Sequence, residues 1–293
     1  MNIYDGFMYY DEDLILDLRL NLLNEFVKKF IIVESKYTHS GKERKLNFDI
    51  KNFSKFKNKI QYIIVDTLPK NILEFHTSDN EYKVNSKILD NAVARENYHR
   101  NMIGLGLNDC NDEDLIIISD IDEIPNLVNF QHKGKVSIFF QKMFYYKFNL
   151  KHPTLIWVGS KACKKKDFIS PQWLRNINSK KYNLWRLDVL FSKKKYFNLN
   201  LIKNGGWHFT SIKKPEDIHY KLSNFLHHLE YEKSKISLEA LTSIINEKKV
   251  LYDHNADKRD NKWNSSISLI KAKDSELPVY LINNKNKYIN FID

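Results

Sequence analysis

Three carboxylates follow a short apolar run near the middle of the chain. The segment Asp114–Pro125 reads D-L-I-I-I-S-D-I-D-E-I-P, so Leu115–Ile118 leads directly toward Asp120, Asp122 and Glu123. A β-branched run of this length is typical of a strand buried on both faces. Acids at the end of a buried strand are costly unless a cation or a strong donor meets them. A hard divalent metal that shares oxygen ligands with a phosphate is the obvious cation, so the segment indicates metal-assisted handling of a phosphate-bearing substrate.

The spacing of the two aspartates suits a shared ligand. Residues i and i+2 of an extended segment lie on one face, so Asp120 and Asp122 could address one cation. The alternative is that these acids cap a helix beginning at Pro125. Such a pair is weak evidence alone, and its position after a buried strand strengthens it.

A second signal is the segment Gly205–Phe209, G-G-W-H-F. The two glycines permit close backbone approach, and His208 could complete a Mn²⁺ or Mg²⁺ shell, Mn²⁺ tolerating nitrogen better. The alternative is a buried histidine with a local hydrogen bond. Trp207 could stack on a sugar or simply fill the core.

Glu96 and Arg100 precede the acidic segment at helical i, i+4 spacing. They are either an ordinary surface ion pair or a pair that presents Arg100 to a diphosphate.

Helices and strands alternate before the acids. The predicted elements are a helix over Asp11–Phe30, strands over Phe30–Glu34 and Gln61–Leu68, a helix over Ser86–Leu107 and a strand over Asp114–Ile118. Alternation of this kind predicts a parallel sheet with covering helices, which binds ligands at the carboxyl ends of its strands. Glu34, Asp66 and Asp120 all fall at such ends.

The second half of the chain predicts an antiparallel extension. Lys135–Leu150 and Leu155–Cys163 are expected to be strands, with another at Gly206–Ile212. Helices are expected over Pro171–Ile177, Pro215–Tyr231 and Ser237–Lys249, a loop over Asp253–Ser266 and a closing strand over Leu277–Ile292. The expected fold class is therefore α/β, with a mostly parallel central sheet flanked by helices and an antiparallel extension, in one domain spanning 1–293.

Composition excludes several classes of protein. With 293 residues and 42% hydrophobic residues, the chain is globular and not disordered. The net charge of +11 rests on scattered lysines such as Lys164–Lys166, so we expect no nucleic-acid partner. A mild attraction to anionic substrates or peripheral contact with a membrane surface is more plausible. No signal peptide or transmembrane segment is predicted, and a cytoplasmic location is expected.

Several blocks of the sequence together resemble glycosyltransferase family 17, the β-1,4-mannosyl-glycoprotein N-acetylglucosaminyltransferase family. They are Glu12–Arg19, Phe30–Gly41, Glu96–Asn101, Asp114–Pro125, Gly205–Phe209 and Pro215–Leu222. The specific part is S-D-x-D-E-I-P with G-G-W-H.

The resemblance implies a GT-A-like fold, a divalent metal and an inverting transfer from a UDP-sugar, with N-acetylglucosamine the expected sugar. The acceptor would be a glycan or glycolipid. Residues 1–130 would bind the nucleotide sugar, 131–250 would bind the acceptor and complete the metal site, and 251–293 would form a C-terminal tail.

Individual roles follow from the same resemblance. Asp120 and Asp122 would hold the metal and diphosphate, with His208 as a further metal ligand. Glu34 would lie near the nucleoside, and Arg100 and Asn101 would face the donor.

Direct inversion also needs a carboxylate that takes the acceptor's proton. Glu216 and Asp217 are the candidates, although both would equally complement the dipole of the helix they begin. Glu123 and Asp188 remain alternatives. Lys221 could neutralise phosphate, and Trp173 and Arg175 could line the acceptor side.

Two other readings stay open. A D-x-D phosphatase or phosphotransferase would use its first aspartate as a nucleophile, usually near the N-terminus. A carbohydrate- or nucleotide-sugar-binding module with an inactive centre is the non-enzymatic alternative.

Overall fold

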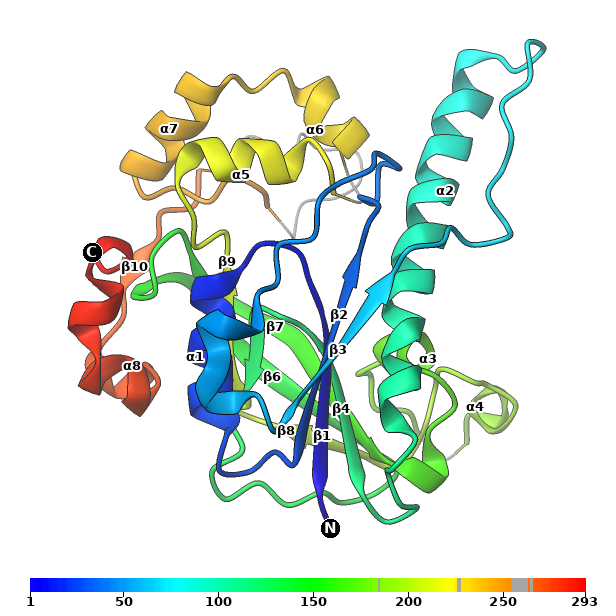
Figure 1. Ribbon diagram of the computed structural model, residues 1–293, viewed down its shortest axis with the longest axis vertical. Coiled ribbons are helices and arrows are strands. Elements are labelled where there is room, and N and C mark those ends of the chain that lie inside the picture. Colours follow the sequence, from blue (N-terminus) through cyan, green and yellow to red (C-terminus); the bar gives the residue numbers. More distant parts are fainter. Residues whose placement is uncertain (184, 226–227, 254–262, 264–265) are drawn as a thin grey trace.

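One mixed β-sheet organises the chain (Figure 1). The computed structural model describes residues 1–183, 185–225, 228–253, 263 and 266–293. Within these residues ten strands form the sheet, in the order β3-β2-β1-β4-β7-β6-β9-β5, with β8 beside β6 and β10 beside β7. The predicted α/β class is confirmed.

The first half of the sheet is parallel. Its strands are β1 (Ile3–Tyr9), β2 (Lys29–Ser35), β3 (Ile60–Val65) and β4 (Leu115–Asp120). β1 pairs with β2 and β4, and β2 pairs with β3, all in parallel. The carboxyl ends of β1, β2 and β4 therefore meet at one edge, where α/β sheets bind their ligands.

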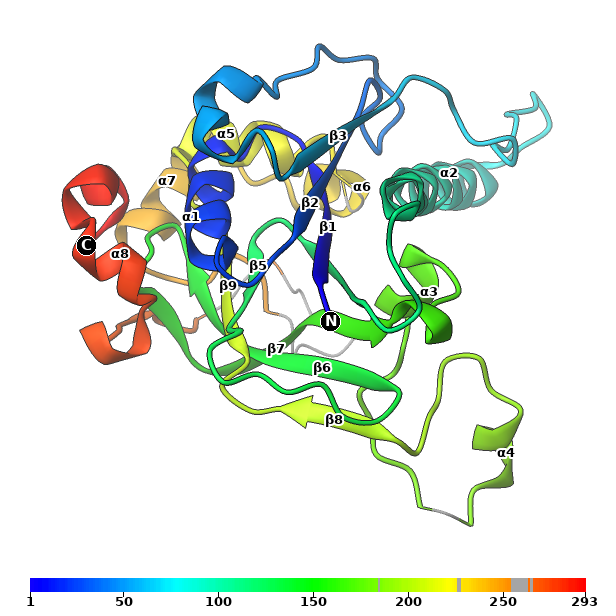
Figure 2. The ribbon, with the colours of Figure 1, turned by 60° about the horizontal axis from the view of Figure 1, so that its bottom comes forward.

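Helices cover both faces of this half (Figures 1 and 2). On one face, Leu16 and Leu20 of α1 (Asp13–Leu23) join a core with Phe7 and Phe30, together with the 3₁₀ helix η1 (Ile50–Phe56). The other face lies under α2 (Glu81–Asn101) and the 3₁₀ helix η2 (Met102–Leu107). Buried on both faces, the strands are continuous apolar runs.

The second half of the sheet is built around a long hairpin. β6 (Val136–Tyr145) and β7 (Leu150–Lys164) are antiparallel, and β7 is antiparallel to β4 as well. β9 (Gly206–Thr210) runs parallel to β6 and antiparallel to the three-residue β5 (Glu123–Pro125). The short strands β8 (Leu199–Ile202) and β10 (Ile270–Lys271) complete it, so the predicted antiparallel extension is confirmed.

The remaining elements of the second half are short helices. They are η3 (Lys165–Asp167), α3 (Pro171–Arg175), α4 (Leu187–Leu190), α5 (Pro215–Leu222), α6 (His228–Ser234), α7 (Leu238–Asn246), η4 (Asp274–Glu276), α8 (Val279–Asn283) and η5 (Lys285–Phe291). In the described part of the chain, none of the helices has the length and apolarity needed to span a bilayer.

The central strand β1 is the main element that the sequence pattern did not predict. Its middle residues, Asp5 and Gly6, are typical of turns. Asp5 is nevertheless fully buried because Arg19 forms an ion pair with it at 2.6 Å. Gly6 is required because η2 crosses here: a Cβ at this position would lie 2.3 Å from Ile103 Cγ2.

Three other elements differ from the prediction, two in their boundaries and one in its type. The expected helix over Asp11–Phe30 ends at Leu23, and β2 begins at Lys29. The expected helix Pro215–Tyr231 is split into α5 and α6. The expected closing strand over Leu277–Ile292 is wrong: this segment is helical, with Leu281 and Tyr288 buried against the α1 face. Most of the expected loop Asp253–Ser266 lies outside the described residues.

Candidate active site

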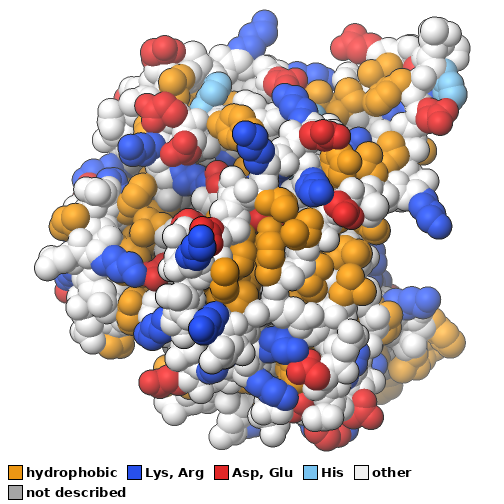
Figure 3. Space-filling model, viewed as in Figure 1, with side chains coloured by type: hydrophobic (Ala, Val, Ile, Leu, Met, Phe, Trp, Pro, Cys, Tyr) orange, Lys and Arg blue, Asp and Glu red, His pale blue; other side chains and the backbone are white. Residues whose placement is uncertain are grey.

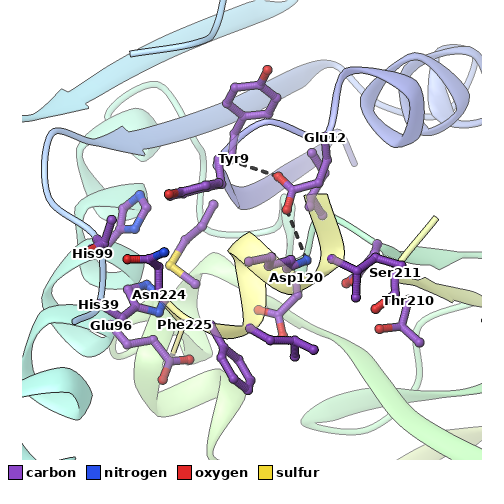
Figure 4. A pocket seen from close by; sticks show the side chains of 18 of the residues that line it. Tyr9, Glu12, His39, Glu96, His99, Asp120, Thr210, Ser211, Asn224 and Phe225 are labelled. Carbon is purple, nitrogen blue, oxygen red and sulfur yellow. Dashed lines mark hydrogen bonds and ion pairs between the residues drawn. The ribbon is translucent and has the colours of Figure 1, made fainter. Parts of the chain in front are cut away.

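A cavity of about 470 Å³ lies at the carboxyl ends of β1, β2 and β4 (Figure 4). Its polar wall contains side chains from segments far apart in the sequence, and Figure 4 shows several of them facing one space: Glu12, His39, Glu96 and Asp120. Lys221 of α5 and His208 of β9 also line it. The strand order brings these residues together, because β4 and β1 end at the same edge.

Asp120 is held by two guanidinium groups. Its Oδ1 lies 3.1 Å from Arg100 Nη2, and its Oδ2 lies 2.8 Å from Arg175 Nη2. Burial alone would raise the pKa of Asp120, but Arg175 and Arg100 outweigh burial and hold it well below its usual range. Arg100 also binds Glu96 Oε1 at 2.6 Å. The pair predicted from spacing is therefore formed, and it faces the acidic strand end.

Glu123 is completely buried behind this aspartate. Arg175 binds it in a bidentate manner: Nη1 donates to Oε2 and Nη2 donates to Oε1, each at 2.7 Å. Trp157 Nε1 donates to Oε1 at 2.6 Å, and the backbone amide of Asp120 donates to Oε2 at 3.1 Å. Glu123 is not among the residues that line the cavity. Its contacts make it the support of the acidic turn, because it joins β5, β7 and α3.

Arg19 fixes the same turn from the α1 side. This guanidinium has no exposed surface, and its Nη1 donates to the carbonyl oxygens of Asp120, Ile121 and Glu123 at 3.2, 3.1 and 2.8 Å. Its Nε and Nη2 bind the Asp5 carboxylate. The turn that carries the acids is thus tied to β1 and α1 through one buried ion pair.

The register of two strands brings Asp122 and His208 together. β5 pairs with β9 so that Glu123 lies opposite His208 and Pro125 opposite Gly206. His208 Nε2 lies 3.5 Å from Asp122 Oδ1. Burial alone would lower the pKa of His208, but the Asp122 carboxylate outweighs burial and raises it. His208 Nδ1 is buried and finds no hydrogen-bond partner among the described residues.

These side chains fit a metal only in part. Asp120, Asp122 and His208 line one cavity, but no group of three or more His, Cys, Asp or Glu in the described ranges is arranged as a ready metal site. Both oxygens of Asp120 face arginines, which leaves Asp122 Oδ1 and His208 Nε2 as the adjacent donor atoms. One carboxylate and one imidazole suit Mn²⁺, and divalent ions of this class often take the rest of their ligands from substrate phosphates and water.

A further ion pair closes the cavity on the α5 side. Lys221 Nζ lies 3.2 Å from Glu12 Oε1, and the backbone amides of Tyr10 and Asp11 donate to Glu12 Oε2. Burial alone would raise the pKa of Glu12, but Lys221 and Lys213 outweigh it and lower the pKa to about 2. Lys221 therefore lines the cavity already paired with a carboxylate, and its predicted role toward phosphate stays a prediction.

Besides Glu123, four more of the predicted site residues lie outside the cavity lining. Glu34 is buried, and its oxygens accept hydrogen bonds from Arg44, Tyr62 and two backbone amides, so it anchors the loop after β2. Asn101 accepts from the backbone amide of Gln172 at 3.0 Å and joins α2 to α3. Glu216 and Asp217 are exposed in the first turn of α5. The structure therefore does not bring these two candidate bases to the other site residues.

The side chains left with two interpretations can also be placed. Trp207 packs against the core and donates from Nε1 to the Glu276 carbonyl at 2.7 Å, and it does not line the cavity. Trp173 is buried and donates to the Lys193 carbonyl at 2.8 Å. Asp188 is exposed and pairs with Arg186 at 2.6 Å.

Two arginines of the site were not recognised from the sequence as its supports. Arg19 appeared only within a resembling block, and Arg175 only as a residue for the acceptor side. The sequence signal that could have found them is the rarity of arginine: the chain has many lysines and few arginines. An arginine kept among apolar residues therefore suggests a contact that needs the several donors of a guanidinium group. Arg19 falls among the leucines of α1, and Arg175 follows Trp173 and Leu174.

Comparison with known proteins identifies the family. Residues 1–152 match the family model described as glycosyltransferase family 17, which covers slightly more than half of the chain. A comparison with curated proteins finds no match. The matched part contains β1 to β5 and therefore both aspartates of the cavity. The chain belongs to glycosyltransferase family 17 and is a glycosyltransferase.

Proposed function

We propose that this enzyme is a metal-dependent, inverting glycosyltransferase of the GT-A type, which moves N-acetylglucosamine from a UDP-sugar to a glycan or glycolipid acceptor. The observation that carries the proposal is the composition of the cavity wall at the strand ends. It combines one adjacent aspartate–histidine pair with cations that can meet a diphosphate.

The charge of the cavity supports a role for a divalent cation. Among the described lining residues, three are cationic and four are carboxylates: Arg44, Arg100 and Lys221, and Glu12, Glu96, Asp120 and Asp122. Each of the cations is already paired with a carboxylate. A diphosphate would thus enter a wall with a formal excess of negative charge, which is unfavourable without another cation.

Asp122 and His208 are the residues we assign to holding Mn²⁺ or Mg²⁺. Such an ion, when bound, neutralises charge that develops on the departing diphosphate. Arg100 and Arg175 orient Asp120, and Lys221 adds a further cation to the cavity lining. The four lining carboxylates are the candidate bases for an acceptor hydroxyl, and Asp120 and Glu12 are the weaker bases among them because neighbouring cations lower the pKa of each.

The aromatic part of the cavity lining supports a carbohydrate acceptor. From residue 145 onward it consists of Tyr145, Tyr146, Trp157, Phe225, Tyr252 and Trp263. Aromatic faces pack well against the apolar faces of sugar rings, and their polar tips supply hydrogen bonds. These side chains come from the β6–β7 hairpin and later segments of the chain, whereas the ends of β1 and β2 supply other parts of the lining.

Nucleotide binding with and without metal tests the proposal. UDP should raise the melting temperature of the wild type in Mn²⁺ and have much less effect in EDTA. Asp122→Asn should remove the Mn²⁺-dependent part of the shift and lower transfer from UDP-N-acetylglucosamine by at least ~100-fold. Asp274→Asn, a change in an exposed carboxylate remote from the cavity lining, is the matched control and should behave as the wild type. Equal UDP shifts in Mn²⁺ and EDTA would contradict the metal assignment.

No observation favours the phosphatase alternative. A nucleophilic aspartate needs a free oxygen in line with the phosphorus, whereas both oxygens of Asp120 are held by guanidinium groups. The same assay covers it, since a phosphatase would release phosphate from UDP or a sugar phosphate without an acceptor.

A further inference from the structure

The segment that connects α3 to β8, residues 178–198, is rich in lysine and contains the short helix α4; we call it the basic excursion. In Figure 2 it projects away from the rest of the molecule, on the side of α3 and β8. None of its described residues lines the cavity, so the active site does not account for it. Its structure was not anticipated from sequence beyond a cluster of lysines at Lys193–Lys195.

The tip of the excursion exposes large apolar side chains. Trp185 is 91% exposed and Phe191 is 89% exposed, and Leu187 and Leu190 are each about two-thirds exposed. Single exposed apolar residues are normal, but a tryptophan, a phenylalanine and two leucines exposed within seven residues concentrate apolar surface on one short segment, which is typical of an interaction site. Figure 3 shows hydrophobic side chains together with lysine or arginine at the right-hand edge of the molecule, where α4 lies.

The base of the excursion is held firmly, so the exposure is not that of an unattached loop. Trp173 Nε1 donates to the Lys193 carbonyl at 2.8 Å, and the Asn178 amide donates to the Lys194 carbonyl at 2.8 Å. The Tyr196 ring meets Trp173 edge to face, with centroids 6.2 Å apart. Val189 is buried, which fixes α4 on its inner side. The tip is therefore presented outward on an anchored stem.

Cations surround the apolar tip. The excursion has six lysines or arginines and a single acid: Lys180, Lys181, Arg186, Lys193, Lys194 and Lys195, against Asp188. Asp188 is already neutralised by Arg186 and Lys195, at 2.6 and 2.9 Å. Lys180, Lys181, Lys193 and Lys194 are exposed. The partner must accordingly combine an apolar interior with a negatively charged surface.

We propose that the basic excursion docks the enzyme on the surface of an anionic lipid bilayer. Trp185, Leu187 and Phe191 enter the boundary between headgroups and acyl chains, while the lysines meet lipid phosphates. Aromatic and leucine side chains on one side with lysines around them are the combination that interfacial membrane segments use. The described tip is a protrusion rather than a groove, which suits a deformable lipid surface better than a folded protein.

Vesicle sedimentation of the full chain tests this inference. The probes are vesicles of pure phosphatidylcholine and of phosphatidylcholine with 30% phosphatidylglycerol. Wild-type protein should pellet with the anionic vesicles, weakly with the neutral ones, and less as salt is raised toward 0.5 M, because screening shortens the reach of surface charge.

Two variants separate the apolar and the electrostatic contributions. The triple change Lys193→Gln, Lys194→Gln and Lys195→Gln should lower the partition coefficient on the order of 100-fold. The double change Trp185→Ser and Phe191→Ser should lower it on the order of tenfold or more. Trp185, Phe191, Lys193 and Lys194 are exposed, and the pair of Lys195 with Asp188 lies at the surface, so circular dichroism and melting temperature should stay close to those of the wild type.

Matched controls lie elsewhere on the surface. Lys51→Gln, Lys55→Gln and Lys57→Gln remove the same charge from η1 and its C-cap, and Tyr82→Ser with Val279→Ser removes two other apolar side chains that are 81% and 73% exposed. Both controls should bind vesicles as the wild type does. The inference is overturned if wild-type protein does not sediment with anionic vesicles, or if the controls lose as much binding as the variants. It is also overturned if the wild type is a dimer that Trp185→Ser with Phe191→Ser makes monomeric, since a second copy would then cover the patch. None of these outcomes bears on the transfer reaction, which is assayed with soluble donor.

Discussion

Replacing Arg175 by methionine would remove the countercharge of a completely buried carboxylate. Arg175 makes two 2.7 Å hydrogen bonds to Glu123 and one of 2.8 Å to Asp120. Methionine keeps much of the aliphatic volume but none of the donors. Breaking a buried ion pair from one side costs about 3–5 kcal/mol, because the remaining charge is left without a partner. We expect the free energy of unfolding of Arg175→Met to fall by about that amount.

A second change separates the loss of charge balance from the loss of packing. In the double variant Arg175→Met with Glu123→Gln, the side chain at position 123 is neutral. Its amide oxygen can still accept the hydrogen bond that Trp157 Nε1 donates to Glu123 in the wild type, at 2.6 Å. The remaining cost is that of lost neutral hydrogen bonds, about 1 kcal/mol each. The double variant should therefore be more stable than Arg175→Met alone by at least ~2 kcal/mol.

Urea unfolding, followed by circular dichroism, measures these differences through the midpoint at constant slope. Arg186→Met is the matched control: it removes an arginine that also binds an aspartate, Asp188, but on the surface, and it should cost less than ~1 kcal/mol. The reasoning is refuted if Arg175→Met is no less stable than Arg186→Met. It is equally refuted if Glu123→Gln fails to rescue the Arg175 variant.

Two further changes test the supports of the site. Gly206 has φ +127°, and a Cβ there would lie 2.1 Å from the Ile124 carbonyl oxygen. Gly206→Ala should therefore lower the free energy of unfolding by at least ~2 kcal/mol, because alanine is strained in this conformation. A decrease of less than half that amount, measured by urea unfolding, would contradict this prediction. Burial lowers the pKa of His99 from 6.5 to about 3, so below pH 6.5 the unfolded chain binds more protons than the folded one. The free energy of unfolding should then fall by ~2 kcal/mol from pH 7 to pH 5 through this residue, and His99→Gln should remove that part of the fall. An equal fall in the wild type and in His99→Gln, measured by urea unfolding at the two pH values, would contradict it.

The elements with consistent local signals were predictable from sequence. Leu115–Ile118 was expected to be a buried strand, and all four residues have no exposed surface in β4. The strand β1 was missed because Asp5 and Gly6 disfavour a strand locally. Asp5 is tolerated because of Arg19, 14 residues away, and Gly6 is required by Ile103 of η2. The end of the chain was assigned the wrong structure because a segment with short apolar runs can pack as helix or strand. In the structure the segment packs as helix against α1, where the Tyr288 hydroxyl donates a hydrogen bond to Asp17 at 2.6 Å.

The site was predictable where strand ends determine it. Asp120, Asp122 and His208 line one cavity, and β4 and β9 explain why. Pairings between distant segments were not predictable, because one sequence gives no measure of which buried charges meet. Glu216 and Asp217 had a sequence signal that fitted catalysis and helix-dipole complementation equally, and their exposed position at the start of α5 suits the second.

The two halves of the chain contribute differently to the site. The family match covers residues 1–152, which contain the acids of β4 and β5. A strand of three residues such as β5 is stable only when paired, and it pairs with β9. The carboxylate of Glu123 is likewise held in place by its hydrogen bonds with Arg175. The cation of Lys221 and the imidazole of His208 also come from beyond residue 152. The matched half therefore supplies the acids together with Arg19 and Arg100, which hold the acidic turn, while the residues beyond 152 add the Arg175 contact and the pairing with β9.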